Sequence, residues 1–156
     1  MILIACIGNI FQGDDAFGVE VAMELMRRPP MPDVRVVDFG IRGLDLTYAL
    51  MDAPELTILV DAVSRGGEPG TIYIIEPELD EVNARPMDAH SMDPLNVLQS
   101  VRSLGGRLGR VVLVGCEPGD LGGEEGRMGL TPPVTAAIEV AADMVESLIA
   151  KELQEA

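Results

Sequence analysis

The chain has 156 residues, of which 47% are hydrophobic and only 3% aromatic. It is therefore long enough for one domain, 1–156, with a core of aliphatic side chains. Its formal net charge of −15 disfavours nucleic acids and anionic membrane surfaces as partners, because both carry negative charge themselves.

The amino-terminal apolar stretch is too short for a signal peptide and lacks a charged lead, and no run of residues is long enough to span a membrane. Cys6 and Cys116 lie in apolar runs. Two such cysteines are typical of buried free thiols in a reduced compartment rather than of a disulfide framework. We therefore expect a cytoplasmic protein.

Apolar runs and helical periodicity alternate along the chain. In chain order they predict a strand at 2–7, a helix at 14–28, a strand at 34–38, a helix at 43–51, strands at 56–61 and 71–75, a helix at 93–104, a strand at 110–115 and a helix at 132–152. Asp14 is a plausible cap of the first helix and Asp93 of the third.

This order predicts the α/β class, a three-layer α/β/α fold with a five-stranded, mostly parallel sheet and helices on both faces. One connection is exceptional. Only the segment SRGGEPG (64–70) separates the third and fourth strands, whereas a parallel crossover needs a dozen or more residues. The fourth strand is therefore expected to be antiparallel and near an edge, making the sheet mixed.

Acidic residues follow four of the predicted strands. Asp14 and Asp15 come after the first strand, Asp38 ends the second, Asp61 ends the third and Glu117 follows the fifth. The carboxyl ends of parallel strands share one edge of a sheet, where ligands collect. Like charges gathered there are unfavourable without a positive charge among them, so a cation is expected.

His90, the single histidine, precedes the third helix and could reach the same edge. Asp15, Asp61 and His90 would form an open three-ligand site suited to zinc or nickel, with manganese or cobalt possible. Structural alternatives exist for each residue. Asp15 could complement a helix dipole, Asp61 could form an Asx turn, and His90 could simply be solvated.

The glycines after the first strand do not indicate a nucleotide site. Gly8, Gly13 and Gly18 do not have the spacing G-x-G-x-x-G, and Asp14 and Asp15 place negative charge where a pyrophosphate would bind.

The opening segment ILIACIGNIFQGDDAFGVEVA (2–22) resembles that of the nickel-iron hydrogenase maturation endopeptidases, with a strand, a Gly-Asn pair, an acidic pair and a glycine three residues on. Further similar segments follow in the same order: DFGIRGL (38–44), LVDA (59–62), AH (89–90), GCEP (115–118) and GLTP (129–132). Asp15 stands where some relatives carry glutamate, which leaves the subgroup open.

The resemblance implies a phosphorylase/hydrolase-like fold with a five-stranded mixed sheet. It implies that Asp15, Asp61 and His90 bind a metal and carry the catalysis. The implied partner is a hydrogenase large-subunit precursor, from which a C-terminal extension is removed after nickel insertion. The implied cofactor is the nickel supplied by that precursor, with zinc or another divalent metal expected to substitute for it in vitro. Either the metal activates the scissile carbonyl and water, or it only docks the substrate while the acids perform the chemistry, as in an aspartyl protease.

Two rival functions share parts of this pattern. A phosphoacceptor receiver module also has an acidic pair and an Asp after its third strand. It needs a lysine after the fifth strand, whereas the single lysine, Lys151, lies in the last helix. A chaperone of the same fold would grip a hydrogenase precursor without cutting it, and the intact set of three ligands argues against it.

Overall fold

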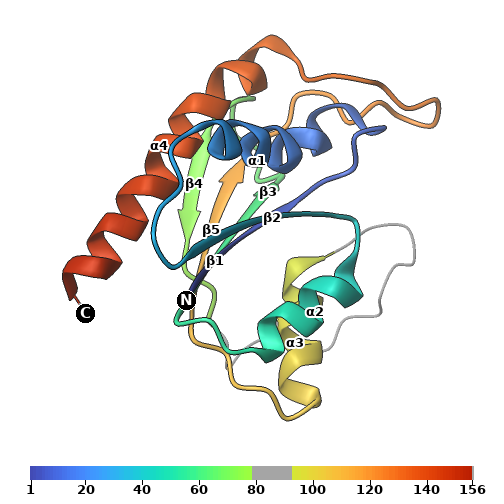
Figure 1. The fold of residues 1–156 in the computed structure, drawn as a ribbon. Coiled ribbons are helices and arrows are strands. Elements are labelled where there is room, and N and C mark those ends of the chain that lie inside the picture. The colour runs from blue at the N-terminus through green and yellow to red at the C-terminus, as the bar shows by residue number, and fades with distance from the viewer. Residues whose placement is uncertain (79–92, 156) are drawn as a thin grey trace.

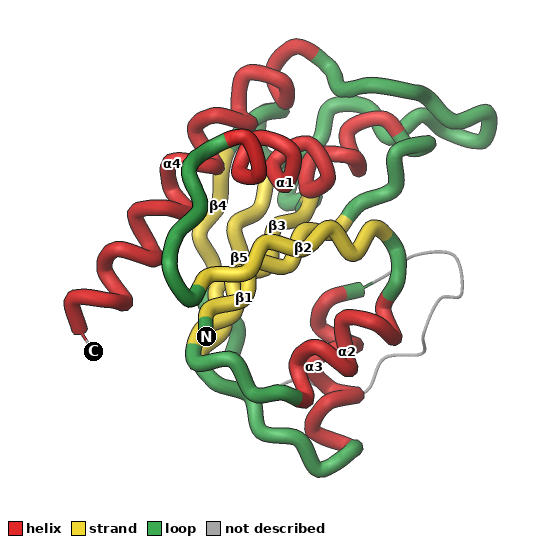
Figure 2. Tube along the Cα trace, in the orientation of Figure 1, coloured by secondary structure: helices red, strands yellow, loops and turns green. Residues whose placement is uncertain are grey.

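The computed structural model describes residues 1–78 and 93–155, which form a mixed sheet flanked by helices on both faces (Figures 1 and 2). The strands are β1 (Ile2–Ile7), β2 (Val34–Gly40), β3 (Leu56–Ala62), β4 (Ile72–Ile75) and β5 (Arg110–Cys116). Their order in the sheet is β2-β1-β3-β5-β4, and β4 pairs with β5 antiparallel while the other pairs are parallel. The predicted five-stranded mixed sheet with an antiparallel edge strand is confirmed.

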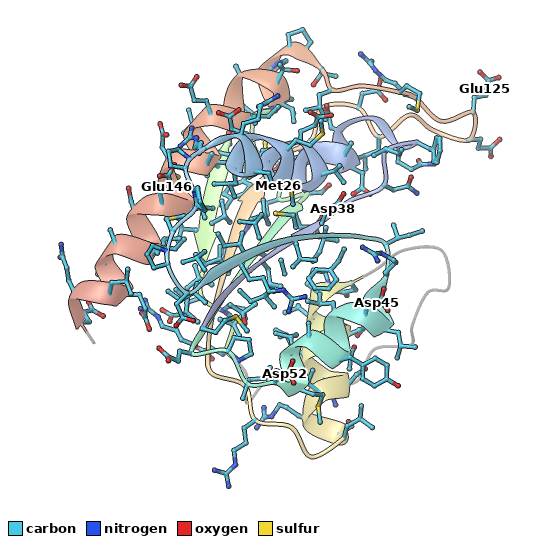
Figure 3. The ribbon with its side chains drawn as sticks, viewed as in Figure 1. Met26, Asp38, Asp45, Asp52, Glu125 and Glu146 are labelled. Carbon is cyan, nitrogen blue, oxygen red and sulfur yellow. The ribbon has the colours of Figure 1, made fainter. Side chains whose placement is uncertain are left out.

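The helices are α1 (Phe17–Arg27), α2 (Gly43–Met51), α3 (Pro94–Ser103) and α4 (Pro132–Glu155), and a 3₁₀ turn, η1 (Gly13–Ala16), precedes α1. Helices α1 and α4 pack together on one face of the sheet, and α2 and α3 on the other. Met26 and Glu146 accordingly lie on the opposite side from Asp45 and Asp52 (Figure 3). Within the described residues, no helix carries an apolar stretch long enough to cross a bilayer.

The two faces of β1 supply two separate cores. Ile2, Ile4 and Cys6 pack with Phe17 and other residues of α1 and α4, whereas Leu3, Ala5 and Ile7 pack with the apolar side chains of α2 and α3. This division follows from the alternation of side chains along a strand. Both cysteines are buried and free, as the sequence predicts, and burial raises the pKa of the Cys116 thiol to about 12.

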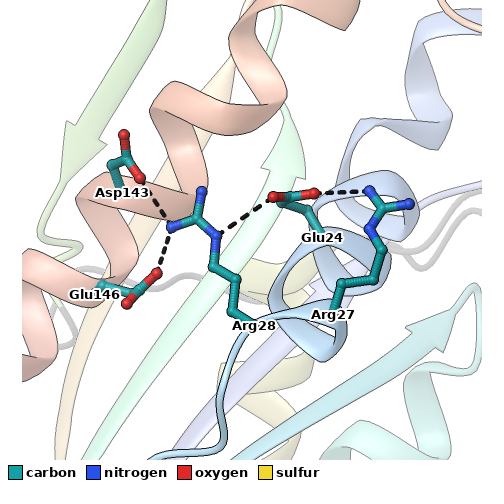
Figure 4. Close-up of polar contacts among 5 residues, drawn as sticks. All are labelled: Glu24, Arg27, Arg28, Asp143 and Glu146. Carbon is teal, nitrogen blue, oxygen red and sulfur yellow. Dashed lines mark hydrogen bonds and ion pairs between the residues drawn. The ribbon is translucent and has the colours of Figure 1, made fainter.

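An ionic cluster joins the end of α1 to α4 (Figure 4). The Arg28 guanidinium donates to Asp143 Oδ1 at 2.8 Å, to Glu146 and to Glu24 Oε1 at 3.4 Å. The Arg28 side chain is only 20% exposed, so solvent screens these interactions less than those of a surface pair. The cluster therefore holds the two helices of this layer together.

The predicted start of the first helix is wrong. Residues 13–16 form the 3₁₀ turn, α1 begins at Phe17, and the Asp14 side chain does not cap it. The Asp14 N–H donates to Asp120 O, and its carboxylate accepts hydrogen bonds from Gly119, Asp120 and Thr131. These long-range bonds outweigh the local pattern that favours a continuous helix.

Candidate functional site

The loop after β1 is held close to the sheet by a glycine. A Cβ at Gly18 would lie 2.1 Å from Ile7 O and 2.6 Å from Val60 O, so only glycine lets the first turn of α1 contact the backbones of β1 and β3. Residue 18 therefore brings the preceding turn, η1, next to the end of β3. This contact explains the glycine that follows the acidic pair in the sequence pattern.

Asp15 on η1 and Asp61 near the end of β3 line one cavity of about 560 Å³. Asp61 is only 8% exposed, and its Oδ1 accepts from the N–H of Ala62 at 2.9 Å. Asp15 is partly buried, and its Oδ2 accepts from the N–H of Asn9 at 3.0 Å. The backbone thus orients both carboxylates, and the structure brings together these two of the three predicted ligands.

The cavity disfavours negative charge. Burial raises the pKa of Asp61 well above its usual value, and the nearby carboxylates of Asp15 and Asp93 raise it further. Burial also raises the pKa of Asp15, although the Asn9 hydrogen bond opposes this shift. Within residues 1–78 and 93–155, neither Asp15 nor Asp61 forms an ion pair with a basic side chain. Acids with raised pKa values in a cavity are typical of catalytic and ion-binding sites.

Asp93 is a cavity residue that the sequence analysis did not assign to the site. Its Oδ1 caps α3 by accepting from the N–H of Leu95 at 2.9 Å, which confirms the predicted cap. It also lines the cavity that holds Asp15 and Asp61. Its place three residues after His90 and at the start of a helix could have indicated a second role beside capping.

His90 lies outside the described residues, so its position relative to the two acids stays a prediction. In the described part of the chain, no three His, Cys, Asp or Glu side chains are close enough to hold a metal ion together. A complete ligand set would therefore need a further donor beyond the carboxylates of Asp15 and Asp61.

The other acids that follow the strands have hydrogen-bonding partners of their own. Asp38 Oδ1 accepts from the N–H of Gly40. Glu117 Oε1 accepts from Tyr73 Oη at 2.8 Å and from the N–H groups of residues 65 and 67. These hydrogen bonds lower the pKa of Glu117.

Asp14 is fully buried and accepts hydrogen bonds from residues of the loop between β5 and α4. Burial alone would raise the pKa of Asp14, but the hydrogen bonds from Thr131, Asp120 and Gly119 lower it. Asp14 and Asp15 are adjacent in sequence, but the pKa of Asp14 is lowered by hydrogen bonds whereas that of Asp15 is raised by burial.

The fold and the acidic cavity together are those of an α/β enzyme with a site at the carboxyl edge of its sheet. The hydrogenase maturation protease family model, HycI, matches residues 19–148. The hydrogenase expression/formation protein HupD of Bradyrhizobium diazoefficiens is 36% identical over 155 residues, covering 96% of this chain and 78% of HupD. The hydrogenase 2 maturation protease of Escherichia coli is 33% identical, covering 92% of this chain and 87% of that protein.

Solved structures agree with these matches. The hydrogenase maturating endopeptidase HybD from E. coli aligns with a TM-score of 0.81 and 32% identity, covering 97% of this chain and 93% of that one. The [NiFe] hydrogenase maturation protease HycI from Thermococcus kodakarensis aligns with a TM-score of 0.76 and 28% identity, covering 96% and 92%. The chain therefore belongs to the hydrogenase maturation protease family. It is an enzyme that hydrolyses peptide bonds.

Proposed function

We propose that this protein is an endopeptidase that removes the C-terminal extension of a nickel-loaded hydrogenase large-subunit precursor. Membership of the maturation protease family supports the reaction class, and the order of the sequence landmarks supports the substrate. The free, buried state of Cys6 and Cys116 supports a cytoplasmic location, where thiols stay reduced.

We propose that Asp15, Asp61 and His90 bind the nickel that the precursor carries. One observation carries this assignment: two carboxylates share a cavity with raised pKa values and with no basic side chain of the described residues to neutralise them. A cation bound there would offset the cost of burying the two carboxylates and would reduce the repulsion between their negative charges. Carboxylate oxygens and an imidazole nitrogen are donors that suit nickel, and zinc or another divalent metal in vitro.

The bound metal would supply a Lewis acid beside the scissile carbonyl. The chain's own contribution is orientation and proton transfer. The N–H of Asn9 holds Asp15, the N–H of Ala62 holds Asp61, and a carboxylate placed in this way can accept the proton of an attacking water. In the alternative mechanism the metal only docks the precursor, and the two acids activate water without it.

Mass spectrometry of a nickel-loaded precursor, before and after incubation with the protein, tests the proposal. Loss of a C-terminal peptide supports the protease. Binding with no change in mass supports the non-cleaving chaperone and contradicts the proposal. Asp15→Asn, Asp61→Asn and His90→Ala should each abolish cleavage. Asp52→Asn is the matched control, because Asp52 is an exposed acid at the end of α2, and it should cleave normally.

A further inference from the structure

Two sequence landmarks with no role in the proposed chemistry contact each other in the structure. Asp14, the first member of the acidic pair, is fully buried. Its Oδ1 accepts from the N–H of Thr131 at 2.7 Å, and its Oδ2 accepts from Thr131 Oγ1 at 2.7 Å. Thr131 belongs to the segment GLTP (129–132). The acidic pair and this distant segment are therefore parts of one hydrogen-bonded unit.

The same carboxylate binds the loop between β5 and α4 at a second place. Asp14 Oδ2 also accepts from the N–H of Gly119 at 2.7 Å and of Asp120 at 2.9 Å. A Cβ at Gly119 would lie 3.3 Å from Asp14 Oδ2, so this close approach favours glycine. One side chain thus holds both ends of the long loop, at 119–120 and at 131.

Backbone hydrogen bonds extend this attachment along the loop after β1. Gly13 N–H donates to Arg127 O at 2.8 Å, Arg127 N–H donates to Phe11 O at 2.9 Å, and Asp14 N–H donates to Asp120 O at 2.8 Å. Gly13 has a φ of +55°, and a Cβ there would lie 2.3 Å from Asp120 O. The turn that carries Asp15 is therefore held by residues of a different connection, the loop between β5 and α4.

We infer that Asp14, through Thr131, is a positioning residue for Asp15. The peptide that joins residues 14 and 15 cannot rotate freely while the Asp14 carboxylate is held by four donors. With this peptide fixed, the Asp15 side chain stays in the cavity lining, where its carboxylate accepts the hydrogen bond from the N–H of Asn9. This inference rests on the proposed function for its catalytic consequence, because it assumes that Asp15 acts in peptide cleavage.

The test compares Thr131→Val, which keeps the shape of the side chain but removes the hydroxyl donor, with Thr131→Ser, which retains it. The matched control is Thr47→Val, which removes a threonine hydroxyl on the other face of the sheet. There Thr47 Oγ1 donates to Gly43 O at 2.9 Å within α2, away from Asp14 and its partners. The measurements are kcat and KM for precursor cleavage, and residue-specific amide hydrogen exchange at Asn9, whose N–H reports the bond to Asp15.

Thr131→Val should lower kcat about tenfold with KM little changed, because outer partners of a site residue typically have effects of this size. It should also speed hydrogen exchange at Asn9, while Thr131→Ser and Thr47→Val leave both kcat and the exchange rate near their wild-type values. Equal effects of Thr131→Val and Thr47→Val, or unchanged exchange at Asn9, would overturn the inference. If the wild-type protein fails to cut the precursor while Asn9 exchange still responds to Thr131→Val, the proposed function fails and the positioning role stands.

Discussion

Replacing Asp61 by asparagine should stabilise the metal-free protein while removing its activity. Asp61 is 8% exposed, and the carboxylates of Asp15 and Asp93 add to the cost of its ionisation. Asparagine keeps the Oδ1 acceptor that binds the N–H of Ala62 and removes the charge. We expect the free energy of unfolding at pH 7 to rise by about 0.5–2 kcal/mol, the range common when an unfavourable functional group is replaced.

The difference in unfolding free energy between Asp61→Asn and the wild type should grow as the pH rises. A carboxyl group with a raised pKa in the folded state stabilises the fold fully below its unfolded pKa, and this contribution is lost as the pH rises through the folded pKa. The wild type should therefore lose stability as the pH rises, relative to Asp61→Asn, and the two proteins should converge in acid.

Urea unfolding followed by circular dichroism, in EDTA and at several pH values from acid to neutral, measures this difference. Asp52→Asn serves as the control, because an exposed substitution of this kind should change stability by less than about 0.5 kcal/mol. A destabilised Asp61→Asn at pH 7, or a difference from wild type that does not grow with pH, would refute the electrostatic account of the cavity.

Three further predictions concern the framework of the site. Gly18→Ala should destabilise the protein by about 3 kcal/mol, since its Cβ would meet backbone oxygens that cannot move independently; thermal unfolding measures this loss, and a wild-type midpoint would contradict it. Arg28→Met should cost about 1–2 kcal/mol in urea unfolding by leaving three acids without their shared cation, and high salt should reduce the effect. Glu117→Gln should flatten the loss of stability in acid, because hydrogen bonds lower the pKa of Glu117 and its contribution disappears as the pH falls through that value; an unchanged acid-unfolding curve would argue against it.

Local patterns in the sequence predict most of the architecture. The five apolar runs became strands, and β1, β3 and β5 are largely buried between the two helix layers. The short segment 64–70 predicted the antiparallel β4 because chain length limits how a connection can cross a sheet. The predicted start of α1 was wrong because hydrogen bonds from Gly119, Asp120 and Thr131 to Asp14 override the local helical signal.

The sequence by itself determined which residue types could form the site: acids after the strands, and a family pattern that singles out Asp15, Asp61 and His90. Only the tertiary structure decided which acids line the cavity and which are held by hydrogen bonds elsewhere. Asp15 and Asp61 share a cavity with Asp93. The carboxylate of Glu117 accepts a hydrogen bond from Tyr73, and that of Asp14 from Thr131. The reason is physical: strand-end position follows from local hydrophobic patterning, but the partner of each carboxylate depends on which distant backbone N–H groups the folded chain brings within hydrogen-bonding distance.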